Sequence, residues 1–213
     1  MQTPLSDDST TQGAAEPDSQ SGSSEAARRE LLSLLRPAGA RTAAPDARQR
    51  ARLLIERLER EMPADLDRDS ALLSGVWELR WSSSALPYLA VGPWIENLQL
   101  LDPERGRGMN LLRLAGPLGP AAGIAVQAAI AIEPPPGSGP SQRVSVRFER
   151  GGWLGPRFGA SRLQLLREVK QSFPAWLDIT VLDGELRVCR GNAGTLFALL
   201  RRDDLRLEDW LGG

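Results

Sequence analysis

The chain has 213 residues, a hydrophobic fraction of 41% and a formal net charge of −1 at pH 7. This length and composition suit one globular domain with a short additional segment, and a nearly neutral chain lacks the basic field that sequence-independent nucleic-acid binding requires. The sequence contains no His and one Cys. These counts exclude Ser-His-Asp and Cys-His catalysis and zinc sites built from His and Cys. We therefore expect no metal and no cofactor.

The first 24 residues favour disorder. They are rich in Ser, Thr, Gln, Gly and Asp and nearly lack bulky apolar side chains, so they cannot bury enough surface to offset their ordering entropy. Their acidic residues argue against a secretory signal or a chloroplast transit peptide. The chain also has no run of about 20 apolar residues, the length that a transmembrane helix needs. We expect a protein that is neither secreted nor membrane-spanning.

A helical hairpin is expected over residues 25–63. Ser24 is a candidate N-cap for a helix over 25–36, which Pro37 ends. A second helix follows Pro45 and ends at Pro63. Its apolar positions form one continuous stripe at helical spacing: Ala51, Leu54, Ile55, Leu58 and Met62.

From Gly75 the hydrophobic period changes to two, which is typical of strands. In the first strand Trp77, Leu79 and Trp81 alternate with Val76, Glu78 and Arg80. Further strands are expected at 95–101, 109–115, 124–133, 143–149, 161–166, 177–182, 185–190 and 195–200. About nine short strands at regular spacing indicate either a sandwich or an antiparallel barrel. We place this β domain at 64–203 and a C-terminal tail at 204–213.

Two motifs point to one family. Residues 176–200 read WLDITVLDGELRVCRGNAGTLFALL, and Gly75-Val76-Trp77 forms a G-x-W at the start of the first strand. Together they resemble the signature of the plastid lipid-associated protein (PAP)/fibrillin family, over about residues 25–201. The resemblance implies a mainly β fold, a lipocalin-like antiparallel barrel of about eight or nine strands preceded by a helical hairpin.

The resemblance also implies a role for Trp77. In lipocalin-like barrels the G-x-W tryptophan closes one end, and an arginine from a late strand packs across its ring. Arg187 and Arg190 lie in the matching late strand and are the candidates here. This role is structural, so we do not expect Trp77 to contact a ligand.

The interior of such a barrel is a candidate ligand site. An eight-stranded barrel is just wide enough for side chains or one small ligand. The alternation of the strands predicts these inward side chains: Leu79, Trp81, Ile130, Ile132, Val146 and Phe148.

Three connections are unusually apolar. They are 84–94, with Tyr88 and Trp94; 116–123; and 152–159, with Trp153 and Phe158. Such loops either fold inward as core or form an exposed rim that meets lipid or a partner. The association of the resembled family with lipid globules (plastoglobules) and thylakoid membranes favours the second alternative. The four aromatic residues would then surround the open end of the barrel, opposite Trp77.

Charged residues cluster near the C-terminal motif, but no catalytic site is expected among them. The members are Asp178, Asp183, Glu185, Arg187 and Arg190. Cross-strand ion pairing that sets the register explains this cluster better than a catalytic carboxylate pair. An enzyme with an Asp/Glu mechanism is the least favoured function.

The function implied by the resemblance is a non-enzymatic lipid-associated protein of photosynthetic membranes. It would bind or coat a carotenoid, quinone or other prenyl lipid, in the cytoplasm or at the thylakoid surface of a cyanobacterium, and in plastids for plant relatives. The alternative is a structural module whose barrel is filled and whose apolar loops dock a protein partner. A cavity larger than about 300 Å³ favours the first, and a filled interior favours the second.

Overall fold

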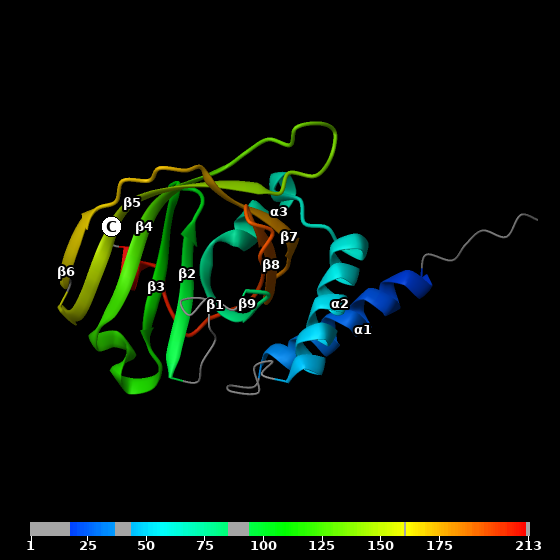
Figure 1. Ribbon diagram of the computed structural model, residues 1–213, viewed down its shortest axis with the longest axis horizontal. Coiled ribbons are helices and arrows are strands. Elements are labelled where there is room, and N and C mark those ends of the chain that lie inside the picture. The colour runs from blue at the N-terminus through cyan, green and yellow to red at the C-terminus, as the bar shows by residue number, and fades with distance from the viewer. Residues whose placement is uncertain (1–17, 37–43, 85–93, 160, 212–213) are drawn as a thin grey trace, which may run out of the picture.

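The computed structural model describes residues 18–36, 44–84, 94–159 and 161–211. Within them one antiparallel sheet carries nine strands, as expected from the alternation (Figure 1). The strands are β1 (Gly75–Ser82), β2 (Ile95–Asp102), β3 (Arg107–Leu114), β4 (Gly123–Ile132), β5 (Arg143–Phe158), β6 (Ser161–Glu168), β7 (Ala175–Leu182), β8 (Leu186–Gly191) and β9 (Leu196–Arg201).

The sheet closes into a barrel rather than forming a sandwich. Its order is β4-β3-β2-β1-β9-β8-β7-β5-β6, and an additional pairing of β4 with β5 completes the ring. Strand β5 makes this closure possible because it is long. Residues 144–154 pair with β4, the first part of the strand pairs with β7 on the other edge, and the second part pairs there with β6. Strand β6 therefore extends the sheet beyond the ring.

The segment 152–159 was expected to be a loop, and this prediction is wrong because it forms the second part of β5. Gly152 shows why glycine is needed there. Its φ is +154°, and a Cβ at this position would lie 2.1 Å from the carbonyl oxygen of Leu165 on β6. The segment 116–123 carries a short 3-10 helix, η2 (Gly116–Ala121), before β4 begins.

Helices α1 (Asp18–Leu35) and α2 (Pro45–Glu61) form the expected hairpin and lie side by side next to β8 (Figure 1). Pro45 opens α2, as its fixed φ allows. Helix α1 begins earlier than expected, so Ser24 lies inside the helix, where it is buried, and does not cap it. The apolar stripe of α2 packs with Leu31, Leu32 and Leu35 of α1 against the outer face of the barrel.

Trp81 belongs to this outer layer, which corrects its predicted inward position. The register of β1 against β9 shifts between Leu79, opposite Leu199, and Trp81, opposite Ala198. A bulge of this kind adds one residue and reverses the facing of every side chain after it. Leu79 therefore points into the barrel, whereas Trp81 is buried against the helices.

The chain after β9 packs on the barrel instead of extending away as a tail. It forms α4 (Glu208–Leu211), in which Trp210 is buried. Arg162 lies 3.9 Å and Arg113 lies 5.0 Å from the centre of the Trp210 ring. Trp210 shares a third core with buried side chains of β1 to β5: Val76, Leu98, Leu100, Met109, Leu111, Ala125 and Leu154.

Candidate functional site: a cavity inside the barrel

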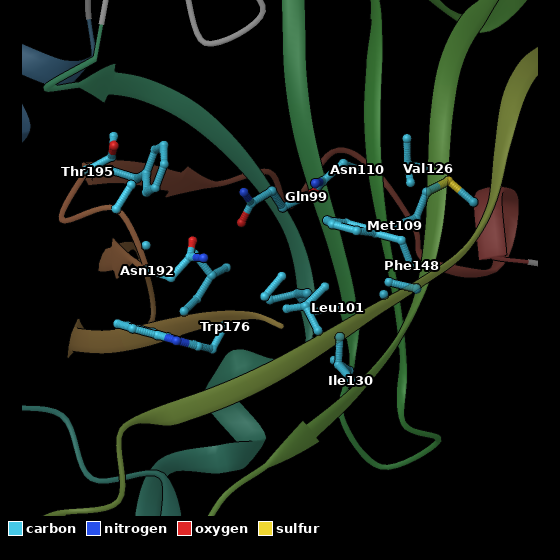
Figure 2. Close-up of a pocket in the computed structure, with 18 of the residues that line it drawn as sticks. Gln99, Leu101, Met109, Asn110, Val126, Ile130, Phe148, Trp176, Asn192 and Thr195 are labelled. Carbon is cyan, nitrogen blue, oxygen red and sulfur yellow. The ribbon is translucent and has the colours of Figure 1, made fainter. Parts of the chain in front are cut away.

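A cavity of about 350 Å³ lies inside the barrel. Figure 2 shows side chains of β2 to β5 on one side of it and Trp176, Asn192 and Thr195 on the other. Most of the wall is apolar. The lining residues are Gln99, Leu101, Gly108, Met109, Asn110, Val126, Ala128, Ile130, Val146, Phe148, Phe173, Ala175, Trp176, Leu177, Gly191, Asn192, Ala193, Thr195 and Phe197.

The side chains of β4 and β5 that were predicted to point inward do belong to this wall, apart from Ile132. Ile130, Val146 and Phe148 all line the cavity. Leu79 and Ile132 do not reach it. Leu79 is buried in the apolar core that Trp77 shares, and Ile132 packs against that core.

The aromatic residues predicted to form the rim do not line the cavity. Trp94, at 79% exposure, and Phe158 are exposed, and Trp153 is partly exposed; none of the three belongs to the cavity wall. Tyr88 lies outside the described residues. The cavity instead opens beside Phe173, Asn192 and Ala193, which are exposed lining residues, and Asn110 of β3 is exposed as well.

Trp176 is a wall residue that sequence reasoning missed as a site, although it stands in the family motif. An Arg–Asp pair holds it in place. Arg143 donates from Nε and Nη2 to the two carboxylate oxygens of Asp178, at 2.8 and 3.0 Å. The same guanidinium lies 3.9 Å from the centre of the Trp176 ring. The ring is therefore fixed as one side of the cavity.

Asp183, Glu185 and Arg190 of the C-terminal cluster bind helices, whereas Asp178 pairs with Arg143 on the neighbouring strand β5. Asp183 accepts hydrogen bonds from Arg28 of α1 at 2.7 and 3.0 Å, and Glu185 pairs with Arg36. Arg190 donates to Glu59 of α2 at 2.8 Å. Of the two candidates for packing on Trp77, Arg190 therefore binds α2 instead.

Trp77 closes the end of the barrel opposite the opening. It is fully buried, and its Nε1 donates to the carbonyl oxygen of Leu73 at 3.0 Å. Leu73 ends helix α3 (Leu66–Leu73), which the sequence analysis did not foresee and which covers this end. Asp65 caps α3, since its side chain accepts from the backbone N–H of Asp67.

Two guanidinium groups flank Trp77. Arg187 lies 5.2 Å from the ring centre, as predicted, and Arg201 lies 5.3 Å from it. Arg201 also donates to the carbonyl oxygens of Leu72 and Ser74, at 3.0 and 2.8 Å. Arg201 thus connects β9 to the end of α3. The sequence signal for this role is its position at the end of the last strand.

The polar floor of the cavity rests on Arg187. This side chain is fully buried, and its Nη2 donates to Oε1 of Gln99. Gln99 on β2 is the register partner of both Trp77 on β1 and Asn110 on β3. Gln99 and Asn110 face the cavity, where Figure 2 shows them next to each other.

A comparison with protein families decides the relationship. The family model described as PAP_fibrillin matches residues 25–200. The chain belongs to the PAP/fibrillin family. No curated protein and no solved structure matches it. The PAP/fibrillin family is lipid-associated and is not known as enzymatic.

Cys189, the one cysteine of this PAP/fibrillin protein, is buried. Burial raises the pKa of the Cys189 thiol to about 11, so the thiolate, which is the reactive form, is scarce at neutral pH. Residues 18–36, 44–84, 94–159 and 161–211 include no cluster of three or more Cys, Asp or Glu able to hold a metal ion.

Among the same residues, no helix combines the length and the hydropathy needed to cross a membrane.

Proposed function

We propose that this PAP/fibrillin protein is a non-enzymatic carrier that holds a carotenoid, quinone or other prenyl lipid in its barrel cavity. The observation that supports this proposal is the largely apolar cavity of about 350 Å³, which lies within the range of small-molecule sites. The alternative, a module with a filled barrel that docks a protein partner, has no use for such a space.

The expected affinity agrees with a carrier. Burying roughly 300 Å² of apolar ligand surface at about 25 cal/mol per Å² gives about 7 kcal/mol before association costs. The loss of translational and rotational freedom removes several kcal/mol, so burial alone supports binding no tighter than about micromolar. That is sufficient for a ligand that is otherwise insoluble.

Filling the cavity tests the proposal. Ala128 is buried and lines the cavity, so the larger side chain of Ala128→Phe should occupy the cavity and abolish binding of a neutral fluorescent reporter such as N-phenyl-1-naphthylamine. Ala131, on the same strand, is exposed. Ala131→Phe is therefore the matched control and should bind as the wild type does. Equal binding by all three proteins would contradict a ligand site in the barrel.

An exposed apolar strip supports contact with a lipid surface. It runs across β2 to β6, where Ile95 pairs with Leu114 and where Ile124, Trp153 and Leu165 lie side by side. All five side chains are at least partly exposed, from 38% at Trp153 to 73% at Leu165. Contiguous exposed apolar surface marks membrane or protein contacts. We place the strip against photosynthetic membranes, as a surface that contacts lipid.

Sedimentation with liposomes tests this placement. The double variant Trp153→Ser and Leu165→Ser should lose most of its sedimentation with phosphatidylglycerol–galactolipid vesicles, because two large apolar contacts are removed. Replacing Leu53 of α2, which is also exposed and lies outside the strip, by Ser is the control. Unchanged sedimentation of the double variant would assign the strip to a protein partner instead.

A further inference from the structure

One hydrogen bond crosses the interior of the barrel under the cavity. Arg187 is on β8 and Gln99 is on β2, and two strands, β9 and β1, separate these strands in the sheet. The bond from Arg187 Nη2 to Gln99 Oε1 therefore spans the interior instead of joining neighbours. Below it lie the Trp77 ring and the core that closes the barrel, and above it lies the cavity.

The orientation of the Gln99 amide follows from this bond. A guanidinium has only donors, so Gln99 must direct its oxygen to Arg187. The amide NH2 group is then left on the other side. It forms no hydrogen bond with any residue that the structure describes, while Gln99 itself lines the cavity. The floor of the cavity consequently presents the Gln99 NH2 group as a hydrogen-bond donor, which pairs only with a hydrogen-bond acceptor.

The floor also carries an uncompensated positive charge. The Arg187 side chain is fully buried, so water does not reach it. Within the described residues no carboxylate pairs with it, and its Nε and Nη1 atoms have no hydrogen-bond partner. Other partly buried arginines of the barrel, such as Arg113 and Arg202, do pair with carboxylates. Buried charges are normally paired, so the missing anion at Arg187 is informative.

We propose that the cavity selects amphiphiles with a carboxylate head, which accepts hydrogen bonds from the Gln99 amide in front of Arg187, while the apolar chain extends past Phe148 and Trp176 to the opening. This inference rests on the proposed carrier function and narrows its ligand class. Gln99 is the binding residue. Arg187 is a positioning residue, since it acts through Gln99 by fixing the amide and adding positive charge behind it.

Chain-matched competitors test the head group. Each competitor displaces N-phenyl-1-naphthylamine from the full-length protein, at concentrations below its own aggregation. Hexadecanoic acid should compete about ten- to a hundredfold better than its methyl ester or hexadecane, the range for a charge-assisted hydrogen bond. Phytanic acid, which has an isoprenoid chain and the same head, distinguishes an isoprenoid source from an acyl source.

Substitutions identify the residues responsible. Gln99→Leu should bring the acid to the level of the ester and leave hexadecane unchanged. Thr195→Val removes another polar lining group, on the segment before β9, and should keep the full acid preference. Arg187→Met should reduce the acid preference as Gln99→Leu does; if this variant does not fold, the comparison of acid with ester in Gln99→Leu still decides.

The outcomes separate two failures. Equal affinity of the acid and the ester in the wild type, or an acid preference that survives in Gln99→Leu, overturns the carboxylate site while leaving the carrier proposal standing. If the reporter does not bind at all, or binds equally to Ala128→Phe, the carrier proposal itself fails. A preference for both acids over the ester that disappears in Gln99→Leu supports the inference.

Discussion

Trp77 is the residue on which the closed end of the barrel depends. Its ring is fully buried between Arg187 and Arg201, and its indole N–H is bonded to α3. Trp77→Ala should therefore lower the free energy of unfolding by about 3–5 kcal/mol, the range for truncating a buried aromatic side chain.

Two other tryptophans provide the controls. Trp94 is exposed and Trp153 is partly exposed, so Trp94→Ala and Trp153→Ala should each be less costly than Trp77→Ala. Denaturant midpoints of the three variants give the order. If Trp153→Ala proves the costliest, the second part of β5 is more tightly packed than the structure indicates.

Single residues were predicted well where the alternation is regular and poorly where the backbone departs from it. Ile130, Val146 and Phe148 face the cavity because β4 and β5 keep their period through this region. Trp81 does not, because the extra residue at Arg80 reverses the facing of β1. A bulge cannot be recognised in the hydrophobic pattern. The regular alternation of Trp77, Leu79 and Trp81 therefore predicted the wrong face for Trp81.

At the scale of elements, ion pairs around the turn after β7 join helix α1 to the barrel, in addition to the apolar contacts of the hairpin. Burial alone would raise the pKa of Asp183, but hydrogen bonds from Arg28 and from the backbone N–H groups of Glu185 and Leu186 outweigh burial and lower it. A carboxyl whose pKa is lowered on folding stabilises the fold above its unfolded pKa, and this contribution is lost as the pH falls through the folded pKa.

Asp183→Asn tests this attachment. The amide oxygen can still accept from the backbone, but the ion pair with Arg28 is lost, so the variant should be about 1–2 kcal/mol less stable at pH 7. The difference from wild type should shrink as the pH falls below 3.8, the ordinary pKa of the group. Asp203, which is 86% exposed, provides the control: Asp203→Asn should show little change at either pH.

The elements themselves were predictable because their signals are local. Helical spacing and proline positions marked α2, and period-two segments marked the nine strands. Helix α3 and the second part of β5 were missed for physical reasons. Helix α3 is only eight residues long, and the glycines after Arg150 resemble a loop unless the close approach of β6 to Gly152 is known.

At the scale of the whole molecule, the closure of the sheet is what creates the site. The pairing of β4 with β5 encloses Gln99 and Arg187, which lie 88 residues apart in the chain. No local pattern contains that proximity, so the polar floor could not be deduced from the sequence. The family motif implied the barrel, but whether its interior was hollow depended on side-chain sizes around the complete ring.

Lipid extraction from the purified protein, followed by mass spectrometry, tests the central claim most directly. The full-length chain and Ala128→Phe should be produced in the same photosynthetic host and purified without detergent. The account predicts a hydrophobic small molecule in near-stoichiometric amount with the wild type and its loss from Ala128→Phe, with Ala131→Phe retaining it. A wild-type protein free of such molecules, or the same amount on Ala128→Phe, would contradict a carrier function of the barrel.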